Sequence, residues 1–135
     1  MTGFSLRIVT PDGLEYEGMA EEVVVRTTTG DVGIQAGHIN YVAPLGMGQA
    51  MLIIDGQKRY AACIGGMLSV VDGKVTIVAT TFEWADEIDV DRADSSAQRA
   101  QNVLTDKRSS ETDLRLAEAR LKRALVRKNV ASRRN

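Results

Sequence analysis

The sequence predicts an all-β sandwich of about eight to ten short strands, followed by a C-terminal antiparallel α-helical hairpin. In the first part of the chain, apolar runs rich in β-branched residues alternate with turn signals such as Asp55-Gly56 and Asp72-Gly73. From Ala85 to Asn135 the chain contains neither glycine nor proline. The loss of these turn residues predicts two domains, residues 1–84 and residues 85–135.

The strands are predicted from the turns that separate them. Asp-Gly pairs suit the positive backbone angles of tight hairpin turns, so Asp55-Gly56 and Asp72-Gly73 each predict a hairpin. Pro11-Asp12-Gly13 predicts a further turn between strands near the N-terminus. The run from Glu21 to Ile34 reads as strand, glycine-containing turn and strand. Gly65 and Gly66 are predicted to be core and bulge features of the sheet.

Two helices are predicted from apolar residues that recur every three or four positions. Ser110 and Asp113 have the spacing of a capping box, which predicts that the second helix begins there. Each helix should be about fifteen residues long, and a polar turn should join them into an antiparallel hairpin. The predicted apolar faces are Ala93, Ala97, Ala100 and Leu104 in the first helix, and Leu114, Ala117, Leu121, Ala124 and Leu125 in the second.

The predicted hairpin has little apolar surface with which to attach itself. The four leucines of these apolar faces would contribute on the order of 10 kcal/mol if all were fully buried, and chain ordering offsets much of that gain. The net attachment should therefore be a few kcal/mol. A ligand present at a hundred times its dissociation constant adds about 2.7 kcal/mol, so even a weak ligand could decide whether the hairpin stays folded.

The composition narrows the class of protein. The formal net charge is −1, which gives the molecule as a whole no strong attraction to nucleic acid or membranes. Cys63 is the single cysteine, which excludes an internal disulfide and a thiolate metal cluster and fits a reducing compartment. His38 is the single histidine, and no serine or cysteine is placed to form a triad with it. We therefore expect a protein without a catalytic site of its own.

Three ordered segments resemble the epsilon subunit family of the bacterial rotary ATP synthase, and the resemblance covers nearly the whole chain. "TTTGDVGIQAGHINYVAPL" (Thr27 to Leu45) resembles the family's Gly-acid-x-Gly-x-x-x-Gly-His segment. "IGGMLSVVDGKVTIVA" (Ile64 to Ala79) resembles its Gly-Gly-x-Leu-x-Val strand pair. "EIDVDRA" (Glu87 to Ala93) resembles its Ile-Asp-x-x-Arg-Ala nucleotide motif.

The resemblance implies a non-catalytic rotor subunit that couples proton flow to ATP synthesis. The sandwich is expected to bind the gamma subunit and the c ring of a complex on the cytoplasmic side of the bacterial cell membrane. The hairpin is expected to have two positions. Folded down, it permits ATP hydrolysis; extended along gamma toward the alpha and beta subunits, it blocks hydrolysis. No cofactor is required, although some members bind ATP in the folded form.

The resemblance also implies a regulatory ATP site at the start of the first helix. The matching positions are Glu83, Ile88, Asp89, Arg92, Ala93 and Arg99. Arginine pairs suit phosphates because the guanidinium group presents planar donors. The alternative is an exposed helix whose Asp89 lies near the positive helix end and whose arginines form ordinary surface ion pairs. No phosphate-cradling glycine loop is present, so any binding should be modest and non-hydrolytic.

Two further sets of residues are assigned to partners on the basis of the resemblance. Asp31 and His38 are expected at the end of the sandwich that faces the c ring; a simple turn role is the alternative. The basic residues of the second helix are expected to contact acidic segments of the catalytic head, or else to form a solvated basic face. These residues are Arg115, Arg120, Lys122, Arg123 and Arg127, with Lys128 beside them.

Two other classes of function remain open at this stage. One is a stand-alone ATP-sensing module that uses Asp89 and Arg92. The other is a basic-tailed β-domain that binds RNA, which the lack of interleaved aromatic residues in the tail disfavours. Copurification with the gamma subunit would separate a rotor subunit from both, and strong salt-dependent binding to mixed RNA would favour the last.

Overall fold

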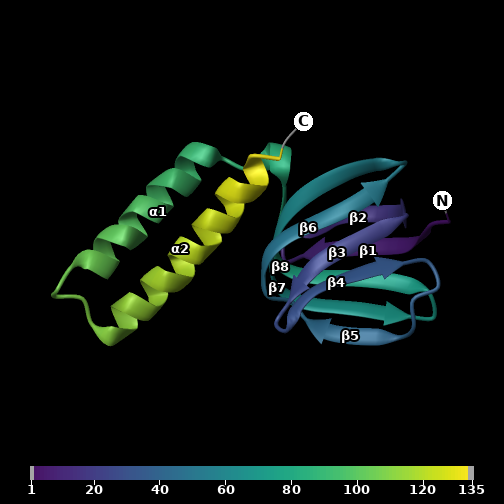
Figure 1. Cartoon of the computed structure of the whole chain (residues 1–135), viewed down its shortest axis with the longest axis horizontal. Coiled ribbons are helices and arrows are strands. Elements are labelled where there is room, and N and C mark those ends of the chain that lie inside the picture. The colour runs from purple at the N-terminus through teal and green to yellow at the C-terminus, as the bar shows by residue number, and fades with distance from the viewer. Residues whose placement is uncertain (1, 134–135) are drawn as a thin grey trace. The chain divides into compact units, whose positions relative to one another are not determined.

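The structure, a computed structural model, describes residues 2–133. It divides into two compact units, Met1–Trp84 and Ala85–Asn135. The first unit consists of strands, and the second consists of a short 3-10 turn and two helices (Figure 1). The predicted fold class, a β-sandwich followed by a helical hairpin, is confirmed.

Eight strands make up the first unit, at the lower end of the predicted number. Hydrogen-bonded neighbours follow one another in the order β2-β1-β8-β7-β6-β3-β4. Strand β5 pairs with a different part of β7 from the part that pairs with β6. All pairings are antiparallel except β1 with β8. The strands are β1 (Phe4–Thr10), β2 (Gly13–Ala20), β3 (Glu22–Thr27), β4 (Gly30–Gln35), β5 (Tyr41–Pro44), β6 (Met47–Ile54), β7 (Gln57–Val71) and β8 (Lys74–Trp84).

Both Asp-Gly pairs form the predicted hairpin turns. Asp55 and Gly56 join β6 to β7 with φ values of 52° and 76°. Asp72 and Gly73 join β7 to β8 with φ values of 50° and 79°. Two successive positive φ angles are the signature of a type I′ turn, whose twist matches that of the flanking strands. The residue types in these two turns therefore set the register between β6, β7 and β8.

Two glycines make the corner at which one sheet becomes two layers. The first half of β7 pairs with β6, and its second half pairs with β5. Between the halves lie Gly65 and Gly66, with φ values of 70° and 111°. The Leu45 N–H donates to the Gly66 carbonyl at 2.8 Å, and the Gly65 N–H donates to the Gly46 carbonyl at 3.0 Å. The corner is thus hydrogen-bonded even though its backbone leaves the ordinary strand conformation.

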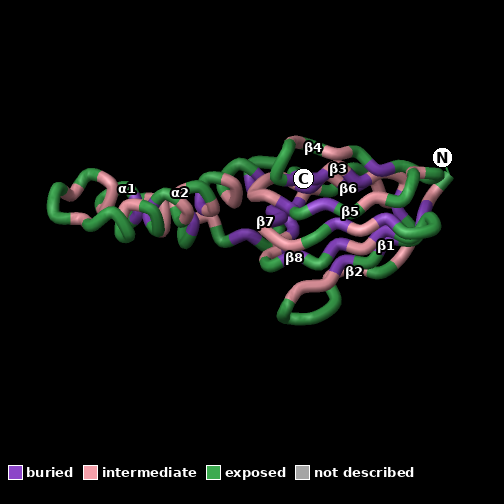
Figure 2. Tube along the Cα trace, turned by 90° about the horizontal axis from the view of Figure 1, so that it is seen from below, coloured by how far each residue is buried: buried purple, intermediate pink, exposed green. Residues whose placement is uncertain are grey.

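The core of the sandwich lies between the two layers. Strands β1 and β8 alternate buried and exposed residues over much of their length (Figure 2), as expected of strands with one face on a core. Cys63 belongs to this core, and its burial raises the pKa of the thiol to about 12. The largest fully buried side chains of the sandwich are Leu6, Ile8, Ile34, Leu52, Leu68 and Ile77.

The second unit contains η1 (Ala85–Glu87), α1 (Val90–Thr105) and α2 (Glu111–Ala131). The helices lie side by side and run in opposite directions (Figure 1). The predicted capping box is present: the Ser110 hydroxyl accepts from the Asp113 N–H, and the Asp113 carboxylate accepts from the Ser110 N–H. Helix α2 has 21 residues rather than about fifteen, because no helix-breaking residue interrupts it.

The apolar seam between the helices is narrower than predicted. Ala93 and Ala100 of α1 and Ala117 and Ala124 of α2 are buried. Leu125, which was predicted to lie in the seam, is 50% exposed. It follows Ala124 by about 100° around the helix, which carries it out of the seam. An interface built mainly from methyl groups leaves the hairpin held together more weakly than four buried leucines would.

Candidate functional site

Asp89 lies at the start of the first helix. It is the N-cap of α1, with extended backbone angles (φ −81°, ψ 100°), and so it lies outside the helix. Its carboxylate accepts a hydrogen bond from the Arg92 N–H at 3.0 Å. Asp89 therefore lies at the positive N-terminal end of α1, where capping turns its side chain back onto the backbone. Its part in an ATP site stays a prediction.

The other residues of the motif divide into buried and exposed groups. Ile88 and Ala93 are each 4% exposed, so both act as packing residues. Arg92 and Arg99 are exposed on α1, and they project from the same side because seven residues are nearly two helical turns. Glu83 lies in β8 of the sandwich unit, opposite Ala62. Within α1, the side chains available to a ligand are therefore the two arginines.

One ion pair shows how the two helices are aligned. Lys128 Nζ of α2 lies 2.8 Å from Asp94 Oδ1 of α1. Both side chains are about half exposed, so the pair lies at the edge of the seam. Because the helices are antiparallel, counting from this pair brings Arg99 level with Arg123 and sets Arg127 between the levels of Arg92 and Arg99.

Helix geometry brings the arginines of both helices to the other edge of the hairpin. At about 100° per residue, Arg92 and Arg99 lie on the flank of α1 that is away from Asp94. On α2, Arg123 and Arg127 lie on the flank away from Leu125. In an antiparallel pair these two flanks are adjacent. We call the set Arg92, Arg99, Arg123 and Arg127 the arginine edge; it spans about 10 Å along α1.

The basic residues of α2 do not form one face. Arg120 lies on the same flank as the arginine edge, one turn closer to the loop. Arg115 and Lys122 are both exposed and project from the outer face of α2, away from α1. The predicted basic cluster is therefore divided between an edge shared with α1 and a separate outer face.

A second feature lies on the sandwich, where an apolar row crosses five strands. Pro44 of β5 lies opposite Met67 of β7, and Met67 lies opposite Val78 of β8. Val78 is also opposite Val9 of β1, which lies opposite Leu14 of β2. Side chains opposite one another in a sheet lie on the same face. We call these five residues the apolar row.

The apolar row is open to solvent. Met67 is 42% exposed, Val78 50% and Leu14 54%. The adjoining row on the same face is more polar, with Ser69, Thr76, Arg7 and Glu17 at successive partner positions. An apolar centre with a polar border is typical of a protein–protein interface.

The structure does not bring Asp31 and His38 together. Asp31 is at the start of β4, where its carboxylate accepts a hydrogen bond from Arg26 Nε at 2.6 Å. His38 follows the other end of the strand, where its Nδ1 lies 2.7 Å from the carbonyl oxygen of Ile39. A six-residue strand spans about 20 Å, so the two residues lie at opposite ends of β4. The expectation that both residues face the c ring stays a prediction.

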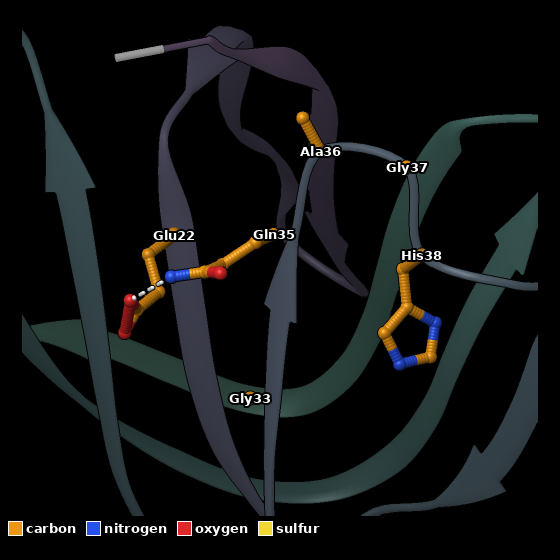
Figure 3. A pocket seen from close by; sticks show the side chains of 6 residues that line it. All are labelled: Glu22, Gly33, Gln35, Ala36, Gly37 and His38. Atoms are coloured by element: carbon orange, nitrogen blue, oxygen red, sulfur yellow. Dashed lines mark hydrogen bonds between the residues drawn. The ribbon is translucent and has the colours of Figure 1, made fainter.

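His38 lines an open depression together with Glu22, Gly33 and Gln35 (Figure 3). The depression has a volume of about 320 Å³. The Gln35 amide donates to the Glu22 carboxylate at 2.8 Å, and the His38 ring stands edge-on to Tyr41 at 5.9 Å. These polar groups are engaged with one another, which fits a structural role for the loop.

Within residues 2–133, no cluster of three or more histidine, cysteine or acidic side chains could hold a metal ion. No helix of the described chain is both long and apolar enough to cross a membrane.

Comparison with known proteins gives the same division into two units. The beta-sandwich domain of the ATP synthase delta/epsilon chain matches residues 3–85. The long alpha-helix domain of the same chain matches residues 86–132. The chain belongs to the ATP synthase delta/epsilon family. As a member of this family, it is a non-catalytic subunit of the ATP synthase.

Bacterial family members match over nearly their whole length. The ATP synthase epsilon chain of Bacillus velezensis is 47% identical over 131 residues, which cover 97% of this chain and 98% of that protein. The ATP synthase epsilon chain of Bacillus pumilus is 44% identical over 133 residues, covering 98% and 100%. The similarity therefore includes both the sandwich and the hairpin.

Two solved structures share the fold. A chain of the Euglena gracilis mitochondrial ATP synthase, in a structure of OSCP, F1 and c-ring, aligns with a TM-score of 0.83 at 21% identity. That alignment covers 98% of this chain and 82% of the other. A chain from the central stalk and c-ring of the Tetrahymena thermophila enzyme aligns with a TM-score of 0.66 at 12% identity, covering 94% and 95%.

Sequence reasoning missed both the apolar row and the contribution of α2 to the arginine edge. The row joins residues from five separate strands, so no local pattern reveals it. A signal for the arginine edge was available: Arg123 and Arg127 are four residues apart on one flank of a helix, as are residues that share a ligand. Without the Asp94–Lys128 alignment, however, the sequence did not tell which flank faces that of Arg92 and Arg99.

Proposed function

We propose that the sandwich docks on the gamma subunit through the apolar row and that the hairpin regulates ATP hydrolysis. The subunit would thereby transmit rotation between the c ring and the catalytic head, at the cytoplasmic side of the bacterial cell membrane. The observation that supports docking is the apolar row itself, a solvent-exposed band that crosses five strands. Such bands are rare on proteins that work alone.

Introducing a charge in the centre of the apolar row tests the docking surface. Val78→Asp should weaken binding of the full chain to the gamma subunit by about tenfold or more, because a buried valine contributes roughly 1.5–3 kcal/mol and a buried unpaired carboxylate adds a further cost. Leu116→Asp, at a similarly exposed position of α2, is the matched control and should bind normally. Equal binding by both variants would exclude the apolar row as the docking surface.

The contact with the c ring is assigned to Asp31 alone, without His38. Asp31 is paired with Arg26 in an exposed position next to the β3–β4 turn. A polar loop of the c ring could exchange for this surface pair at little cost, since exposed ion pairs are worth less than about 1 kcal/mol. His38 remains a candidate for contacts at the opposite end of β4.

Inhibition of hydrolysis is assigned to the hairpin on two observations. Its seam is built mainly from alanines, so the helices can separate at modest cost. Arg120, Lys122, Arg123 and Arg127 lie on two faces of α2, which would let an extended α2 contact acidic segments of the alpha and beta subunits on more than one side.

Changing Arg120, Lys122, Arg123 and Arg127 together to glutamine should relieve inhibition of ATP hydrolysis in the assembled complex. The altered subunit should still assemble. Hydrolysis is measured at saturating ATP, beside a complex whose subunit ends at Trp84. We expect both complexes to hydrolyse ATP equally fast, and faster than the unaltered complex. If the four-residue variant inhibits as strongly as the unaltered chain, electrostatic braking by α2 is excluded.

The arginine edge supports ATP as a regulatory ligand. Guanidinium groups from both helices lie on adjacent flanks, and a triphosphate could accept charge-assisted hydrogen bonds from both sides. The same groups on α2 are also those proposed for the catalytic head. ATP and the head would therefore compete for Arg123 and Arg127, which gives a direct reason why bound ATP would hold the hairpin in its non-inhibitory position.

A stand-alone ATP-sensing module is less well supported. It offers no role for the apolar row, and the similarity to ATP synthase epsilon chains extends over 97–98% of this chain in the two relatives described above. An RNA-binding role is less well supported for the same reasons.

A further inference from the structure

The two ends of the helical hairpin are held in different ways. At the loop end, the Ser109 hydroxyl donates to the Val103 carbonyl at 2.8 Å, and so ties the loop to α1. The capping box of Ser110 and Asp113 fastens the start of α2 at the same end. At the open end, the Asp94–Lys128 ion pair joins the helices. The loop end is thus closed by local hydrogen bonds. The open end has this charge pair between residues distant in sequence, beside Val130 and Ala131, which are buried near the end of α2.

The charges at the open end also suit the helices that carry them. Asp94 is near the N-terminal end of α1, where negative charge is favoured, and Lys128 is near the C-terminal end of α2, where positive charge is favoured. On the opposite edge of the seam, the arginine edge gathers like charges from both helices. The hairpin therefore has one edge with a pair of opposite charges and one edge with arginines from both helices.

We propose that the Asp94–Lys128 pair is a clasp that holds the open end of the hairpin closed. Opening must begin at this end, because the loop end remains joined through the chain. Separation of α2 from α1 at this end breaks the ion pair. The clasp therefore sets how often the hairpin opens when no anion occupies the arginine edge. The regulatory consequence rests on the proposed function; the clasp itself does not.

The clasp is testable by measuring the distance between the helices in the full chain. Spin labels are placed at Ser95→Cys and Asn129→Cys, both exposed positions near the open end. Cys63 can stay, because it is 3% exposed and burial raises its pKa to about 12, so it should not react with the label at neutral pH. Double electron–electron resonance then reports the closed and open populations in the absence of nucleotide.

Asp94→Asn and Lys128→Met should each raise the ratio of open to closed hairpin by about two- to fivefold, the range of exposed ion pairs. The double variant Asp94→Lys with Lys128→Asp, which swaps the two charges, should restore most but not all of the closed population. The restoration is incomplete because each charge is then unfavourable at its own helix end. Asp91→Asn is the matched control: it removes an exposed acid from the first turn of the same helix and should leave the distances unchanged.

Unchanged distances in both single variants would overturn the clasp. So would a charge exchange that opens the hairpin more than either single change. Hydrolysis by the assembled complex is measured with the same variants to separate the clasp from the proposed regulation. If Asp94→Asn opens the hairpin but does not increase inhibition, the clasp stands and the inhibitory role of the open hairpin fails.

Discussion

Replacing Gly66 by alanine should lower the free energy of unfolding of the sandwich by about 3 kcal/mol or more. A Cβ atom at this position would lie 1.9 Å from the carbonyl oxygen of Val78 and 2.8 Å from the Cα atom of Ala79. Both are backbone atoms of the paired strand β8, so no side chain can move aside. Gly66 also has a φ of 111°, which side chains of L-residues rarely allow.

The measurement is chemical denaturation followed by the fluorescence of Trp84, the single tryptophan of the chain. Trp84 packs in the sandwich core and carries the Arg59 guanidinium 3.8 Å from its ring centroid, so unfolding changes its surroundings. Gly33→Ala is the matched control, because a Cβ there meets Val24 at an ordinary 3.8 Å. Equal stability of the two variants would mean that the corner can rearrange without cost.

The combined variant Arg92→Ala and Arg99→Ala should lose about a hundredfold or more in affinity for ATP. A hydrogen bond to a charged group contributes about 1.5–3 kcal/mol, which corresponds to about ten- to a hundredfold for each arginine. These two arginines belong to α1 and are not among the residues proposed to contact the catalytic head. Their loss therefore tests the ligand site without removing the α2 residues proposed for inhibition.

Calorimetric titration of the full chain with ATP measures the effect, and two pairs of variants sharpen it. Arg123→Ala should weaken binding, whereas Lys122→Ala, one position away and on the outer face of α2, should not. Asp89→Ser keeps a side-chain acceptor for the Arg92 N–H, whereas Asp89→Ala removes it. If the serine variant binds ATP as the native chain does and the alanine variant does not, Asp89 acts through the helix start.

Two results would count against the site. Equal losses in Arg123→Ala and Lys122→Ala would indicate a general effect of charge rather than the arginine edge. No binding by the native chain at cellular ATP concentrations would leave a mechanical coupling subunit, whose hairpin responds to rotation. The docking surface on the sandwich does not depend on either result.

Much of the fold could be predicted because the deciding interactions are local. The turns at Asp55-Gly56 and Asp72-Gly73 depend on residues that tolerate positive φ, and the start of α2 depends on Ser110 and Asp113, three residues apart. Such signals are contained in a few consecutive positions. The family resemblance was readable for the same reason, since its three motifs are short and occur in order.

The sites were less predictable because they depend on which segments become neighbours. Asp89 was assigned to an ATP site by its motif, and only the structure shows that it also caps the start of the helix. Asp31 and His38 were expected together, but an extended strand separates them. Leu125 was expected in the seam, but close packing of Ala117 and Ala124 left it outside.

The sequence by itself thus determined the two-unit plan, the hairpin turns, the helix start at Ser110 and the absence of a catalytic constellation, because each of these depends on residue types at short spacing. Only the tertiary structure decided that Val9, Leu14, Pro44, Met67 and Val78 form one row, since strand pairing joins positions far apart in the chain. Only the alignment of α1 with α2, which the Asp94–Lys128 pair marks, set these two opposite charges on one edge of the hairpin and the arginines on the other. Helix periodicity orders the residues within each helix, but which edges meet is decided by packing between the helices.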